Sequence, residues 1–111
     1  MQLPDLVAHL LALPGAEETH PFGDEPDVYK VDGRMFAILS RAPVPMRISL
    51  KCDPDLAEAL RRTHPAITPG YHLSKRHWNT VVLDGSVPDD EPLGMIAHSH
   101  ELVAAARPRR G

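Results

Sequence analysis

"MRISLKCDPDLAEALR", residues 46–61, places an alternating segment directly before a helical one. Apolar side chains occupy every second position from Met46 to Cys52, and polar side chains lie between them. This period of two predicts a strand with one buried and one solvated face. The residues expected on the solvated face are Arg47, Ser49 and Lys51.

The second half of the stretch predicts a helix. Asp53 is suited to the N-cap and Pro54 to the first helical position. Leu56, Ala59 and Leu60 follow at helical spacing and form the expected apolar stripe. A solvated strand that leads into a capped helix is typical of a mixed α and β domain.

The flanking segments extend this pattern in both directions. In the segment 27–40, Asp32-Gly33 is a two-residue turn signal, which predicts a hairpin with Tyr29 opposite Phe36. Periodicity and turn residues predict the other elements. The expected elements are a helix over 3–13, a hairpin over 27–40, a strand over 46–52, a helix over 54–64, a strand over 78–83 and a helix over 89–106.

The order α-β-β-β-α-β-α predicts an α+β fold. We expect a single-domain α/β sandwich over residues 1–106, with a mainly antiparallel sheet, helices packed on one face, and a frayed tail over 107–111. The other face of the sheet is then partly open. If Val81 points inward, Trp78 and Thr80 lie on the same open face as the solvated residues of the strand 46–52.

The composition of the chain excludes several classes of protein. The chain has 111 residues, and no run of 18 apolar residues that would predict a transmembrane helix. The N-terminus lacks a basic region, so we expect no signal peptide. The single cysteine, Cys52, excludes an internal disulfide and indicates a reducing cytoplasm. The net charge is −3, yet residues 47–81 hold six Lys and Arg against three Asp and Glu, so this middle segment is a candidate site for an anionic partner.

Motifs for catalysis and for metal binding are missing from the sequence. Nucleotide-binding glycine patterns and a nucleophile elbow are absent, and Cys52 is expected on the buried face of its strand. The pairs His72/His77 and His98/His100 lack the i, i+4 spacing of a helical zinc pair. We therefore expect a protein that is not an enzyme and that needs no metal or cofactor.

The stretch "YHLSKRHWN", residues 71–79, combines cations, aromatic rings and histidines. One interpretation is that Lys75 and Arg76 contact phosphates while Tyr71 and Trp78 stack on bases. The other is that the rings cover the edge of the sheet and the cations are solvated. The candidate residues for binding nucleic acid or another anion are Arg47, Lys51, Tyr71, His72, Lys75, Arg76, His77, Trp78 and Asn79.

Several blocks of the sequence together resemble the MmcQ/YjbR family. They are "LPGAEETHPFG", "YKVDGRMFAIL", "ISLKCDPDLAEALR", "ITPGYHLSKRHWNTVVLDGSVPDDE" and "IAHSHELVAA". The resemblance covers residues 3–106 and implies a CyaY-like fold, also called a double wing, and a DNA-binding label. The residues that match the family motif are Lys51, Tyr71, His72, Lys75, His77, Trp78 and Asn79. This chain has Ser74 where the family often has Asn, and His100 where an aromatic residue, commonly Tyr, is usual.

The resulting hypothesis is a small, monomeric, cytoplasmic protein that binds DNA weakly and in a salt-dependent manner. Two alternatives stay open. One is a binding module for a small anionic ligand or nucleotide, and the other is a protein-interaction module that docks a partner on the open sheet face.

Overall fold

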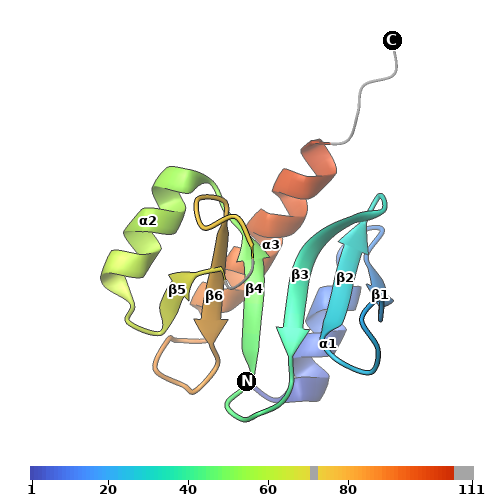
Figure 1. Cartoon of the computed structure of the whole chain (residues 1–111), viewed down its shortest axis with the longest axis horizontal. Coiled ribbons are helices and arrows are strands. Elements are labelled where there is room, and N and C mark those ends of the chain that lie inside the picture. Colours follow the sequence, from blue (N-terminus) through green and yellow to red (C-terminus); the bar gives the residue numbers. More distant parts are fainter. Residues whose placement is uncertain (71–72, 107–111) are drawn as a thin grey trace.

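In the part of the chain that the structure describes, six strands form one antiparallel sheet in the spatial order β1-β2-β3-β4-β6-β5 (Figure 1). The computed structural model describes residues 1–70 and 73–106; the tail expected over 107–111 lies outside them. The strands are β1 (Glu17–Thr19), β2 (Asp27–Val31), β3 (Arg34–Ser40), β4 (Arg47–Lys51), β5 (Ile67–Pro69) and β6 (Trp78–Val82). The expected α+β fold with a mainly antiparallel sheet is therefore confirmed.

Within these described residues, three helices accompany the sheet: α1 (Leu3–Leu11), α2 (Pro54–Thr63) and α3 (Asp90–Ala105). In Figure 1, α1 and α3 lie behind the sheet, and α2 lies at its β5 end. The helix α3 packs against β3 and β4, whereas α2 packs against β5 and β6. As expected, Asp53 caps α2, because its carboxylate accepts a hydrogen bond from the Leu56 amide at 3.4 Å.

The core lies between α1, α3 and the face of the sheet that they cover. The alternation predicted for β4 is observed, with Ile48 and Leu50 fully buried and their neighbours half-buried. Ser99 joins α3 to two strands, because its hydroxyl donates to the Phe36 carbonyl at 2.5 Å and accepts from the Lys51 amide at 2.9 Å. The other large buried residues of the core are Leu6, Leu10, Tyr29, Phe36, Leu39, Val81, Ile96 and Val103.

Three local expectations are wrong. The strands β1 and β5 were not predicted, so the described residues form two more strands than the sequence indicated. Tyr29 pairs with Ala37 rather than with Phe36, because a shift in register between Tyr29 and Lys30 leaves one extra residue in β3. In α2 the buried residue is Ala57, whereas Leu56 of the expected apolar stripe is 41% exposed.

Candidate functional site

The face of the sheet opposite α1 and α3 carries a pocket of about 720 Å³, which we call the open-face pocket. Phe22 and Pro26, from the connection between β1 and β2, line it, and Leu73 lines it from the connection between β5 and β6. Its other lining residues belong to four strands of the sheet: Met35, Ile38, Ser40, Arg47, Ser49, Thr68, Thr80 and Val82.

The pairing of β4 with β6 fixes which side chains share this face. Ser49 lies opposite Thr80, and their hydroxyl oxygens are 2.8 Å apart, within hydrogen-bonding distance. The pairs on either side along the two strands are Arg47 with Val82 and Lys51 with Trp78. Directly opposed residues of antiparallel strands point to the same side. The predicted grouping of Trp78 and Thr80 with the polar residues of β4 is therefore confirmed.

A tight turn precedes β6 and presents two cations to solvent. The Ser74 carbonyl accepts hydrogen bonds from the His77 amide at 3.1 Å and the Trp78 amide at 2.9 Å. The guanidinium of Arg61 on α2 donates to the Lys75 carbonyl at 3.1 Å and so anchors the turn from the side. Lys75 and Arg76 are exposed on this turn. These backbone hydrogen bonds hold the turn in place, with the two cations at its surface.

Two of the predicted site residues, Trp78 and Asn79, are buried. Trp78 is only 8% exposed. Asn79 is fully buried and points toward α2, where its amide donates to the Ala57 carbonyl at 3.2 Å and its oxygen accepts from Arg61 at 2.7 Å. His77 is exposed, and its carbonyl accepts from the Cys52 amide at 2.7 Å. The predicted residues Tyr71 and His72 lie outside the described residues.

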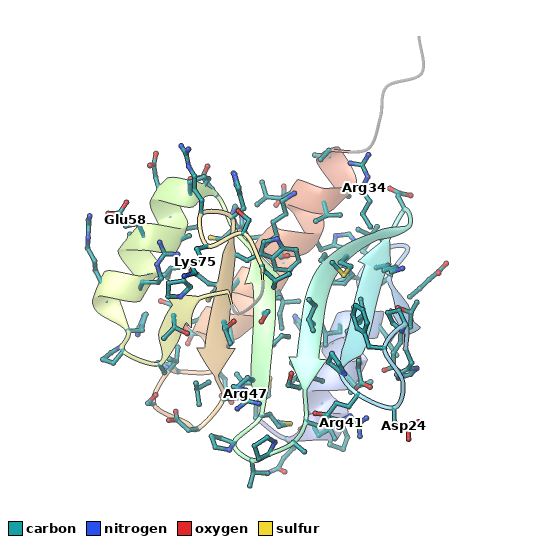
Figure 2. The ribbon with its side chains drawn as sticks, viewed as in Figure 1. Asp24, Arg34, Arg41, Arg47, Glu58 and Lys75 are labelled. Carbon is teal, nitrogen blue, oxygen red and sulfur yellow. The ribbon has the colours of Figure 1, made fainter. Side chains whose placement is uncertain are left out.

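The cations of the predicted site fall into two groups. Lys51 lies opposite Trp78, at the end of β4 near the turn, whereas Arg47 lies at the other end of β4. Their Cα atoms are four residue steps apart along the strand, a distance of about 13 Å. Figure 2 shows Lys75 and Arg47 apart, with Lys75 near α2 and Arg47 near the start of β4. We call Lys51, Lys75 and Arg76 the basic end.

These cations differ in their partners from Arg41 and Arg62. Arg62 is paired with Glu58, and Arg41 is paired with Asp27. Within residues 1–70 and 73–106, by contrast, the side chains of Arg47, Lys51, Lys75 and Arg76 make no ion pair. In an acidic protein, cations without internal partners are available to an external anion.

A buried carboxylate near the pocket was not predicted as part of any cluster. Asp27, 4% exposed, accepts from the Arg41 Nε at 2.8 Å and lies 3.0 Å from the His20 Nε2. Arg41 also donates to the Asp24 carbonyl at 2.7 Å, so it joins the β1–β2 connection to the end of β3. The Asp27 carboxylate raises the pKa of Arg41 through this hydrogen bond and its charge. This cluster left little sign in the sequence, because Arg41 is an isolated residue directly after β3 and belongs to no periodic pattern.

The histidines of α3 bond to neighbouring backbone. The His100 Nε2 lies 2.7 Å from the Pro14 carbonyl, and its ring packs edge-on against Phe36 with centroids 5.2 Å apart. The His98 Nε2 accepts from the Asp53 amide at 3.3 Å. In the part of the chain that the structure describes, no three His, Cys, Asp or Glu side chains gather as metal ligands. No helix in that part has the length and apolarity needed to cross a membrane.

The sequence and the structure both have relatives. The YjbR family model matches residues 11–102. The uncharacterized protein YjbR of Escherichia coli strain K12 is 36% identical over 108 residues, which are 97% of this chain and 92% of that protein. The uncharacterized protein YbdF of E. coli O157:H7 is 34% identical over 100 residues, covering 90% of this chain and 82% of that one.

Two crystal structures share the fold. The Deinococcus radiodurans protein DR2400, a DUF419 domain, superposes with a TM-score of 0.92 at 41% identity, over 98% of this chain and 83% of that chain. A Pseudomonas syringae protein superposes with a TM-score of 0.78 at 24% identity, over 93% and 99% of the two chains. At that identity, the second likeness shows the fold alone.

Proposed function

This chain belongs to the YjbR family, and we propose that it is a small binding module, without catalytic activity, whose partner is an anion. Nucleic acid is the leading candidate for the partner. The observation that supports this proposal is the basic end, where Lys51, Lys75 and Arg76 make no ion pair within the described residues. The tight turn holds the last two side chains at the surface, where a phosphate backbone can reach them.

The strength of such binding is limited by the small number of cations. Three phosphate contacts give a shallow salt dependence, and the Kd for nonspecific binding is on the order of 10⁻⁴ to 10⁻⁶ M at physiological salt. The net charge of −3 repels a polyanion from the rest of the surface. Trp78 is nearly buried, so base stacking contributes little, and the contacts are chiefly to phosphates.

The chemistry of Cys52 supports the proposed absence of catalysis. Cys52 is 3% exposed, and burial raises the pKa of its thiol to about 11. A thiol of this kind stays protonated at neutral pH and is a poor nucleophile. The same reduced cysteine accords with a cytoplasmic protein, which we include in the proposal.

A titration of labelled single-stranded and duplex DNA and of RNA, at about 50 and 200 mM salt, tests the function. We expect the wild type to bind at the lower salt concentration and the double variant Lys75→Ala/Arg76→Ala to bind more weakly. For Lys75→Ala alone, affinity should fall about equally for all sequences, and the salt slope should decrease by about 1.

The matched control is Lys30→Ala/Arg34→Ala, which removes the same charge from the β2–β3 hairpin. Figure 2 places Arg34 at the α3 end of the sheet, away from Lys75. Equal loss of affinity in both double variants, or no wild-type binding at low salt, contradicts the nucleic-acid proposal. A different result would support a small anionic ligand at the basic end instead. In that case saturating inorganic phosphate displaces the DNA completely, and Lys75→Ala loses its affinity for the phosphate.

A further inference from the structure

We propose that the open-face pocket is a second binding site, distinct from the basic end, and that it takes a small organic carboxylate with a compact apolar body. The pocket has a volume of about 720 Å³, within the range of about 300–1,000 Å³ that is usual for small-molecule sites. It is bounded by two loops and by the open face of the sheet. Nucleic acid at the basic end is not required for this inference.

The charge of the pocket selects an anion. Arg47 is the one charged residue among those that line the pocket in the described part of the chain, and no carboxylate lines it. The guanidinium makes no ion pair there. Its planar fork of N–H donors fits both oxygens of a carboxylate. One cation balances one negative charge, which favours a carboxylate over a dianionic phosphate.

The hydroxyl groups beside Arg47 supply a further donor. In the pair formed by Ser49 and Thr80, one hydroxyl hydrogen bridges the two oxygens 2.8 Å apart. The hydrogen of the second hydroxyl is then free to point into the pocket. Ser49 lies two residues from Arg47 on the same face of β4, about 7 Å along the strand. The two donors therefore flank one polar region of the pocket.

The remaining lining selects the body of the ligand. Among the described residues, eleven line the pocket, and six of these are apolar: Phe22, Pro26, Met35, Ile38, Leu73 and Val82. Phe22 is 68% exposed, although exposure of a large aromatic ring to water is unfavourable. A ligand ring or branched chain that covers Phe22 and the apolar strand residues removes this surface from water. A carboxylate without such a body leaves most of the pocket unfilled.

The test uses the whole protein and phenylacetate as the probe, followed by NMR chemical shifts of the backbone amides and by calorimetry. We expect saturable binding with a Kd on the order of 1 mM or tighter, with shifts concentrated on β3, β4 and β6. Phenylacetamide, which lacks the charge, and acetate, which lacks the body, should each bind at least about tenfold more weakly.

Three variants locate the site. Arg47→Gln should weaken phenylacetate binding by about tenfold or more, and Arg47→Lys, which keeps the charge without the fork, should lie between it and the wild type. Phe22→Ala removes an exposed ring and should reduce affinity several-fold without loss of the fold. Lys75→Gln, the matched change of one cation at the basic end, should leave the affinity unchanged.

Several results would overturn the inference. They are equal binding of phenylacetate and phenylacetamide, unchanged affinity in a folded Arg47→Gln protein, or no saturation at tens of millimolar probe. Phenyl phosphate that binds more than about tenfold tighter than phenylacetate would replace the carboxylate with a phosphate ester. Failure of DNA binding has no bearing on these readouts, because the wild type and Lys75→Gln are compared with the small probe alone.

Discussion

Asn79 holds α2 against the sheet with a single side-chain amide. Both ends of this amide are satisfied in a fully buried position, one by the Ala57 carbonyl at 3.2 Å and the other by Arg61 at 2.7 Å. Arg61 also donates to the Lys75 carbonyl. The Asn79 amide therefore helps to position α2 and, through Arg61, the tight turn before β6. Removing a buried polar group is costly when its hydrogen-bond partners are left without a replacement.

Asn79→Ala should therefore destabilise the protein. We expect the free energy of unfolding to fall by about 1–3 kcal/mol, because the Ala57 carbonyl loses its donor and the Arg61 guanidinium loses an acceptor. Urea unfolding of the variant and the wild type measures this loss. Thr68→Ala, a truncation at an exposed position on β5, is the control and should stay within about 0.5 kcal/mol of wild type. A loss no larger than that of the control would show that the amide has no structural role.

The connection between β5 and β6 is built around close contact of two backbone segments. The Gly70 amide donates to the Trp78 carbonyl at 2.8 Å, and a Cβ added at Gly70 would lie 2.7 Å from the Trp78 Cβ. Glycine is thus required here because a side chain would collide with a residue of the next strand.

Gly70→Ala and Gly94→Ala form a matched pair. At Gly70 the methyl group must displace Trp78, so we expect a loss of about 1–3 kcal/mol in the free energy of unfolding. Gly94 lies inside α3 with nothing within 4 Å of an added Cβ. There the higher helix propensity of alanine should stabilise the protein by up to about 1 kcal/mol. Thermal and urea unfolding measure both changes, and effects of the same sign would contradict this account.

The elements differ in how far they could be predicted. The strand β4 was predictable because its alternation is set by burial of one face, and α2 because Asp53 and Pro54 mark its start. The strands β1 and β5 have three residues each, too few for any periodicity to be visible. The extra residue in β3 also leaves no sequence signal, since it follows from the register of the partner strand.

The site was less predictable than the fold, for a physical reason. The pattern of cations and aromatic residues over 71–79 located a surface turn, but it could not separate exposed Lys75 from buried Asn79. The open-face pocket combines residues from four strands and two loops. Its walls depend on where Phe22, Pro26 and Leu73 lie relative to the sheet, which local sequence does not encode.

At the scale of the whole molecule, two acidic groups are kept neutral by the fold. Burial raises the pKa of the Cys52 thiol from 9.0 to about 11. Burial, and then the hydrogen bond of 2.6 Å to Glu18, also raises the pKa of the Tyr29 hydroxyl. In both cases the folded state holds its proton at a pH where the unfolded state has lost it. Stability therefore has an alkaline limit that comes from the interior of the protein.

The free energy of unfolding should fall as pH rises above about 9. Above the unfolded pKa of Cys52, 9.0, the unfolded state binds fewer protons than the folded state, so the slope of stability against pH is negative until the folded pKa near 11. Urea midpoints at pH 8, 9 and 10 measure this decline. In the double variant Cys52→Ala/Tyr29→Phe, stability should decline less steeply with pH, and an unchanged slope would assign the effect to other groups.

The two edge strands of the sheet determine how readily the protein aggregates at high concentration. An unpaired strand edge is a template for intermolecular β-pairing and fibril growth. Here β1 is three residues long and carries Glu17 and Glu18, and β5 is equally short and ends at Pro69, which has no N–H to donate. Short, charged and proline-terminated edges resist the addition of a foreign strand. The protein should therefore stay dispersed at high concentration, although no helix of the described residues covers one broad face of its sheet.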